Sequence, residues 1–86
     1  MKGTEKQIKW AQDIINTAYA DLSSMESMTK MVSLNYTAED VKVIRDQLDV
    51  LFADPRLTAS MVIDIRGRIS RQQLEAQAIA HHNLTK

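Results

Sequence analysis

Histidines are the first residues to consider for chemistry, because imidazole is both a metal ligand and a proton carrier near neutral pH. The 86-residue sequence contains two, His81 and His82, and they are adjacent. Neighbouring helical residues point about 100° apart, so this pair lacks the i, i+4 face that zinc prefers on helices. We therefore expect no metal site. We interpret both side chains as part of a solvated helix C-terminus, where imidazolium complements the helix dipole.

A carboxylate among apolar residues also invites a catalytic interpretation, and Asp64 lies in such a run at residues 62–68. A general acid or base needs a second reacting group and a cleft, and the sequence indicates neither. Asp64 and Arg68 are four residues apart, a spacing at which opposite charges pair on a helix. We predict an Asp64–Arg68 ion pair that holds one helix against another.

Trp10 is the single tryptophan, and Lys6 and Lys9 flank it. A tryptophan edged by lysines can stack on a nucleic-acid base. It can equally pack at the edge of the core while its indole N–H reaches water, and we favour this second interpretation. A local basic patch would draw on this segment and on a second cluster formed by Arg66, Arg68 and Arg71.

The overall charge argues against nucleic acid as the main partner. Eleven Lys and Arg residues balance eleven Asp and Glu residues, so the formal net charge is zero. Nucleic-acid-binding proteins usually carry a basic excess, because phosphate neutralisation supplies most of their non-specific affinity. The sequence also lacks a glycine-rich phosphate loop and any Ser/His/Asp or Cys/His set. We expect no catalytic residue and no cofactor.

Helix is the one element with repeated support in the sequence. Residues 4–7 have the form of a capping box, in which the Thr4 hydroxyl accepts from the Gln7 amide. Thr37 and Ser70 are the other predicted starts. Hydrophobic staples accompany both of them, formed by Tyr36 with Val41 and by Ile69 with Leu74.

The predicted helix ends are less well defined. Asn35 and Gly67 suit left-handed helix stops, and Asp54-Pro55 ends the second helix or opens a short one. A first helix over residues 5–34 would be about 45 Å long, against a diameter of roughly 30 Å for a compact globule of this size. Either it breaks near Ser23, or the molecule is elongated and pairs with another copy.

These elements predict an all-α fold: one helical domain over residues 1–86, a small bundle of three to five helices. The starts at Thr4, Thr37 and Ser70 are 33 residues apart, which indicates either two helix-pair repeats or a coincidence of spacing. A methionine-rich tract is better explained as core filling than as an adaptable binding surface. Its members are Met25, Met28 and Met31, with Met61.

The sequence predicts a cytoplasmic protein. It has no cysteine and no apolar run near the roughly 20 residues of a membrane helix, and its N-terminus lacks the apolar segment of a signal peptide. A chain this short has a thin stability margin, and such domains often gain stability from self-association or from a partner. We therefore expect a homodimer or a complex with another protein.

Residues 3–14 resemble the N-terminal signature of small helical proteins found in Gram-positive bacteria, their phages and mobile elements. That signature reads Gly-Thr/Ser-x-Lys-Gln-x-x-Trp-Ala-x-x-Ile, and residues 59–66 are similar to a second segment of these proteins, with Val62 where an aromatic is common. The resemblance implies a helical fold in a bacterial host and no particular reaction. It leads us to expect a protein-binding accessory protein, such as an anti-CRISPR-like inhibitor of a host defence component. The alternatives are a small nucleic-acid-binding protein and a self-assembling structural module.

Overall fold

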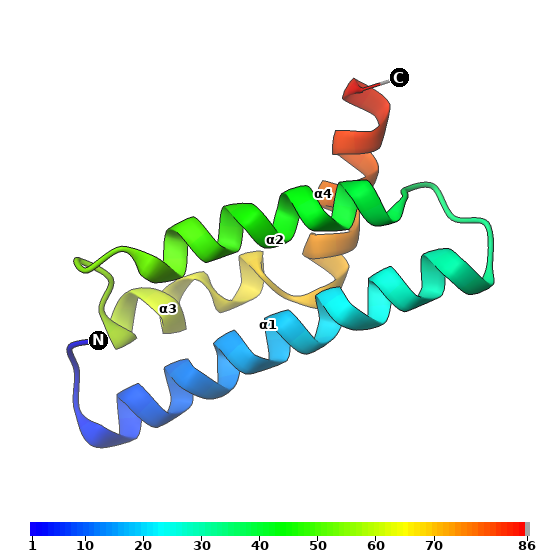
Figure 1. Cartoon of the computed structure of the whole chain (residues 1–86). Helices are drawn as coiled ribbons and strands as arrows, with labels where there is room; N and C mark the ends of the chain where they lie inside the picture. The colour runs from blue at the N-terminus through cyan, green and yellow to red at the C-terminus, as the bar shows by residue number, and fades with distance from the viewer. Residues whose placement is uncertain (86) are drawn as a thin grey trace.

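Four α-helices and one short 3-10 helix make up the protein in a computed structural model that describes residues 1–85 (Figure 1). Helix α1 lies antiparallel to α2, the shorter α3 lies beside them, and α4 crosses the bundle and projects past α2. The predicted all-α bundle is confirmed. The elements are α1 (Glu5–Met31), α2 (Ala38–Ala53), α3 (Ala59–Ile65), η1 (Arg66–Arg68) and α4 (Arg71–Leu84).

Helix α1 runs unbroken for 27 residues, so the molecule is elongated, with extents of 43 × 22 × 17 Å. Of the two alternatives, a break near Ser23 or an elongated molecule, the structure shows the elongated one, and the serines at the possible break contact other helices. The Ser23 hydroxyl accepts from Arg45 of α2 (3.3 Å), and the Ser24 hydroxyl accepts from Arg71 of α4 (2.8 Å). Both hydroxyls thus join the continuous α1 to neighbouring helices.

All three predicted helix starts are confirmed, although their caps differ. Thr4 and Gln7 form the full capping box, and at Thr37 the reciprocal partner is Asp40. Ser70 is the residue before α4, but its hydroxyl donates to the Gly67 carbonyl and makes no cap hydrogen bond. The start of α3 at Thr58, whose hydroxyl accepts from the Met61 amide, was not predicted.

The predicted left-handed stops are wrong. Within residues 1–85 Gly3 alone has a positive φ, so neither Asn35 nor Gly67 is left-handed. Helix α1 instead ends three residues before the expected Leu34, where Val32 adopts an extended conformation. Asp54 ends α2 in the same extended way, as the Asp54-Pro55 prediction allowed.

Two hydrophobic clusters form the core, and α1 contributes to both. The first contains Leu22, Met25 and the four staple residues, which are all buried as predicted. The second gathers Ala11 and Ile15 of α1 against α3 and the turn before it. The methionine prediction is confirmed for Met25 alone, because Met28, Met31 and Met61 are exposed.

The equal spacing of the three starts does not correspond to a repeated structure. Residues 4–36 contain the single helix α1, whereas residues 37–69 contain α2, α3 and η1. In the part of the chain that the structure describes, no helix is long and apolar enough to cross a membrane.

The N-terminal residues dock against the start of α3. The Ala59 amide donates to the Lys2 carbonyl (2.8 Å), and Gly3 follows with φ at +154°. A Cβ on Gly3 would lie 2.8 Å from the Ala59 Cβ, which is closer than carbon atoms normally approach. Glycine is therefore required at position 3 for both its backbone conformation and the available space.

We expect Gly3→Ala to lower the free energy of unfolding by about 1–3 kcal/mol, because it places a side chain in a disfavoured backbone conformation and against Ala59. Urea unfolding followed by circular dichroism measures this change. Gly67→Ala is the matched control, since no atom lies within 4 Å of its built Cβ. It should leave stability unchanged or raise it by up to about 1 kcal/mol; an equal loss in both variants would contradict the account.

Candidate functional site

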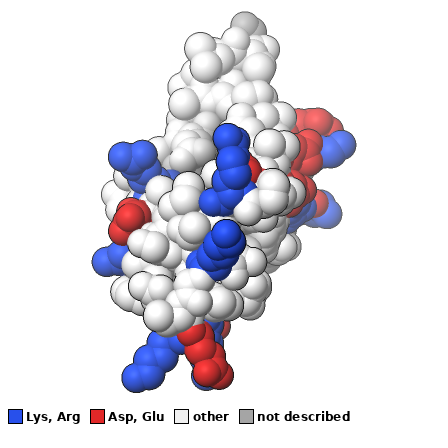
Figure 2. Space-filling view, turned by 90° about the vertical axis from the view of Figure 1, so that its left-hand side faces the viewer, with Lys and Arg blue, Asp and Glu red and all other residues white. Residues whose placement is uncertain are grey.

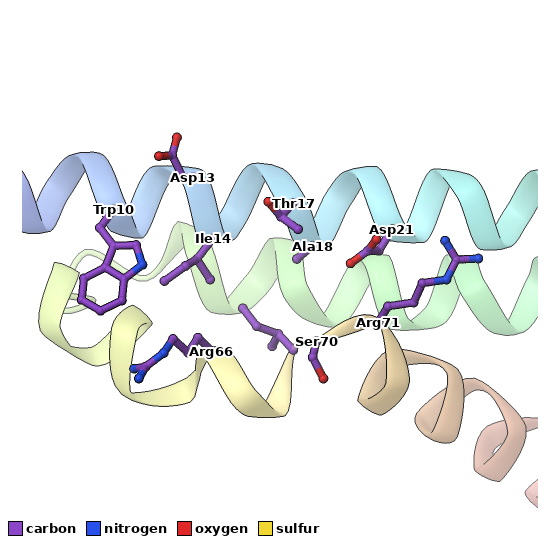
Figure 3. A pocket seen from close by; sticks show the side chains of 10 residues that line it. Trp10, Asp13, Ile14, Thr17, Ala18, Asp21, Arg66, Ser70 and Arg71 are labelled. Atoms are coloured by element: carbon purple, nitrogen blue, oxygen red, sulfur yellow. The ribbon is translucent and has the colours of Figure 1, made fainter.

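A groove lies on the surface between α1 and the segment that joins α3 to α4 (Figure 3). Its volume is about 430 Å³, within the range of small binding sites. Apolar side chains from both sides, Ile14, Ala18 and Ile69, form its floor. We call it the Trp10 groove; its lining comprises Trp10, Asp13, Ile14, Thr17, Ala18, Asp21, Arg66, Ile69, Ser70 and Arg71.

Trp10 and Arg66 together form one end of the groove (Figure 3). The Arg66 guanidinium carbon lies 5.2 Å from the centre of the indole ring, within cation–π range, and an Arg66 N–H donates to the Ile63 carbonyl at 2.6 Å. Trp10 is nevertheless 50 % exposed. The favoured interpretation, edge packing with one part of the ring in water, agrees with this position, yet the exposed half is a substantial apolar surface.

Carboxylates and guanidinium groups line opposite sides of the Trp10 groove. Asp13 and Asp21 belong to α1, whereas Arg66 and Arg71 belong to the α3–α4 side. Figure 3 shows Asp21 directed toward the groove and Asp13 directed away from its floor. The groove thus has an apolar floor, an anionic rim on α1 and a cationic rim on the α3–α4 side.

Arg71 lies in this groove but is held by contacts within the protein. Its side chain donates to the Ser24 hydroxyl and to Glu75 (3.1 Å), so it joins α4 to α1. The predicted cluster of three arginines is therefore not a free cationic patch. Arg68 is exposed outside the groove, and its carbonyl accepts from Gln77 at 3.3 Å.

The remaining predicted residues are dispersed. Lys6 and Lys9 are exposed on α1 and do not line the groove. Asp64 is exposed, and within residues 1–85 it makes no ion pair, so the predicted Asp64–Arg68 bridge is wrong. It fails because the chain passes from α3 into the 3-10 helix η1 at Arg66, which breaks the α-helical i, i+4 geometry. On the face in Figure 2, cationic and anionic side chains are interspersed.

Sequence reasoning missed a buried polar cluster centred on Asp40. This carboxylate is 2 % exposed and accepts from the Thr37 amide (2.7 Å) and the Thr37 hydroxyl (2.9 Å). Nδ1 of His81 lies 2.6 Å from one of its oxygens, and Nδ1 of His82 lies 3.0 Å from the other. The histidines are in the last turn of α4, as predicted, but both contact Asp40, so their interpretation as solvated residues is wrong.

The hydrogen bonds of the Asp40 cluster connect two helices, and they also set the pKa of the carboxyl group. Burial alone raises the pKa of Asp40, but hydrogen bonds from His81, Thr37 and His82 outweigh it and hold the pKa at about 2, below the ordinary 3.8. Among residues 1–85, no group of three potential ligands is placed to hold a metal ion. The cluster instead joins the end of α4 to the start of α2.

Acidification should destabilise the fold through Asp40. Because the folded-state pKa is depressed, the carboxylate contributes stability above the unfolded value near 3.8 and loses it as the pH falls toward 2. We expect the free energy of unfolding to fall between about pH 4 and pH 2, as measured by urea titrations at fixed pH steps. A stability that is flat across this window in the wild type would contradict the assignment.

Tyr19 is a second group with a shifted pKa. Burial, together with its hydrogen bond to Asp49, raises the pKa of Tyr19 to about 12. The Tyr19 ring packs edge-on against the Phe52 ring, with 6.0 Å between the ring centroids. Such a phenol stays protonated at neutral pH and joins α1 to α2.

Comparison of the chain with protein-family models, with curated proteins and with solved structures gives no match.

Proposed function

We propose that this protein acts by binding another protein without catalysis, and that the Trp10 groove is its contact surface. The observation that carries the proposal is a half-exposed tryptophan beside an apolar groove floor with a charged residue on each rim. Tryptophan and arginine are the side chains most enriched at the energetic centres of protein interfaces, and they occur here as a stacked pair. The groove lining contains three residues of these two types: Trp10, Arg66 and Arg71.

A protein partner fits this surface better than a nucleic acid does. Two carboxylates, Asp13 and Asp21, line the same groove as the arginines and would repel phosphate. Arg71 already donates to Glu75 and Ser24, which leaves Arg66 as the less engaged cation in the groove. A base stacked on Trp10 would therefore have little cationic support for its backbone.

The proposed setting is a bacterial cell that carries a phage or mobile element. This part rests on the resemblance of residues 3–14 to small proteins from such elements. In that setting the partner we propose is a host defence component, which the protein would occupy and inhibit in the manner of an anti-CRISPR. The support for this step is association rather than chemistry.

Affinity capture from a bacterial lysate, with mass spectrometry, tests the proposal. Trp10→Ala should remove at least nine-tenths of the captured partner, because it deletes the exposed anchor while leaving the buried face of α1 intact. Met31→Ala is the control, since Met31 is an exposed apolar residue on the same helix, outside the groove. Unchanged capture by the Trp10 variant would rule out this surface.

The nucleic-acid alternative makes a different prediction. Binding to DNA or RNA would weaken steeply with salt and would be lost on charge reversal at Arg66 and Arg68. Filter binding at two salt concentrations separates the two functions. Salt-dependent binding of this kind, without protein capture, would overturn the proposal.

A further inference from the structure

We propose that the partner segment bound by the Trp10 groove is an amphipathic helix whose apolar stripe is edged by lysine or arginine on the side that meets α1. This inference rests on the proposed function, because it names the chemistry of the partner that the same surface binds. It follows from three features of the groove: the spacing of its α1 side chains, its apolar floor and the carboxylates on one rim.

The α1 side of the groove has the spacing on which a second helix packs. The side chains that line it advance in steps of four, three and four residues over about three helical turns: Trp10, Ile14, Thr17 and Asp21. Side chains at this spacing form a ridge, and such ridges fit between the side chains of a neighbouring helix. Trp10 and Thr17 are exposed, so the ridge is accessible to a helix of a partner.

The floor of the groove offers apolar surface to the stripe of such a helix. Ile14 packs against both hydrophobic clusters, and Ala18 and Ile69 are buried beside it. Trp10 adds a half-exposed indole at one end (Figure 3). A volume of about 430 Å³ accommodates apolar side chains that project from successive turns of a bound helix, which is how a helix anchors itself in a groove.

Two carboxylates lie on the α1 rim, and within residues 1–85 neither Asp13 nor Asp21 makes an ion pair. They are eight residues apart on one helix, or about 12 Å along its axis. Lysines or arginines seven or eight positions apart on a helix lying along α1 have nearly the same separation. One basic flank of the partner can therefore pair with both carboxylates, and the long side chains of lysine and arginine can reach Asp13 on the outer side of the rim.

The cationic rim determines which way round the helix lies. Arg71 is held by Ser24 and Glu75, so its charge is already compensated. Arg66 stacks on Trp10, and among residues 1–85 it has no carboxylate partner. A helix bound with its basic flank toward this rim would place cations beside Arg66, which is unfavourable. The basic flank therefore faces α1.

Selection from random peptides tests this chemistry. Immobilised wild-type protein, offered a displayed library of random peptides of about 18 residues, or five helical turns, should enrich sequences with apolar residues at every third or fourth position. The same sequences should carry Lys or Arg seven or eight positions apart on one flank. Trp10 is the single tryptophan, so its fluorescence measures the Kd of enriched peptides synthesised without tryptophan. Asp13→Lys/Asp21→Lys should raise that Kd at least tenfold, because attraction becomes repulsion.

A matched control variant makes the same change of charge elsewhere. Asp46→Lys/Asp64→Lys alters two exposed carboxylates outside the groove and should bind the peptides as the wild type does, and circular dichroism establishes that each variant folds. Selection with the Asp13→Lys/Asp21→Lys protein should enrich Asp or Glu on the flank where the wild type enriches Lys or Arg. An empty wild-type selection, enriched peptides without helical spacing, or the same flank charge from both proteins would overturn this inference.

Lysate capture separates this inference from the proposed function. Capture that is lost with Trp10→Ala and kept with Asp13→Lys/Asp21→Lys would leave the protein-binding function standing and overturn the basic flank. Capture that Trp10→Ala leaves unchanged would remove the surface itself, and the inference with it. A wild type that sediments as a dimer, with Trp10→Ala as a monomer, would place a second copy in the groove in place of a basic helix.

Discussion

Asp40→Ala should lower the free energy of unfolding by about 2–4 kcal/mol, a substantial fraction of the stability of a small domain. The carboxylate satisfies the Thr37 amide at the start of α2 and pairs with His81 and His82 at the end of α4. Its removal deletes a helix cap and leaves two half-buried imidazoles without their acceptor. Urea unfolding at pH 7 measures the loss.

Two comparisons make this prediction specific to the ionised carboxylate. Asp40→Asn keeps the shape and one acceptor oxygen but removes the charge, so it should lose less stability than Asp40→Ala. In both variants the acid-induced loss of stability between about pH 4 and pH 2 should shrink, because the group responsible has gone. An unaltered pH profile in Asp40→Ala would show that other carboxylates produce it.

Met25→Ala should cost about 2–5 kcal/mol, because it removes a fully buried side chain from the first hydrophobic cluster. Met25 is 0 % exposed and packs where α1 meets the other helices. The resulting cavity cannot collapse readily, since continuous α1 fixes the positions of the residues on either side. Thermal unfolding by calorimetry gives the change in midpoint and enthalpy.

Met31→Ala provides the matched comparison on the same helix. Met31 is 76 % exposed, so its replacement should change stability by no more than about 0.5 kcal/mol. Similar losses at both positions would contradict the burial that distinguishes them. The pair also tests the expectation that the methionine tract fills the core, which holds for Met25 and fails for Met31.

Local signals were sufficient to predict where helices begin. The capping box at Thr4 and the staples at Thr37 and Ser70 involve residues within five positions of one another, so the sequence contains the whole interaction. The same local signals could not predict whether α1 continues past Ser23 and Ser24. Ser23 and Ser24 accept hydrogen bonds from arginines that lie 22 and 47 residues further along the chain, and spacing along the chain does not reveal such pairs.

In the candidate site, too, the sequence indicated individual residues but not the contacts between distant ones. Trp10 and Arg66 were both singled out from the sequence, but their stacking across 56 positions depends on how α3 packs against α1. Asp13 and Asp21 carried no signal, since an acidic residue on a helix is usually solvated. The contact of His81 and His82 with Asp40 could not be predicted from the sequence either. Asp40 is explained locally by the cap at the start of α2, and the histidines are explained by their place in the last turn of α4.

The unbroken α1 has a consequence for how the protein folds. One helix supplies Ala11 and Ile15 to one cluster and Ala18, Leu22 and Met25 to the other, so neither cluster has a separate scaffold. Fraying of α1 in its middle would disconnect both clusters at once, and α4 docks on a surface complete only after α1 and α2 have paired. The two small cores should therefore melt in a single cooperative transition rather than as independent units.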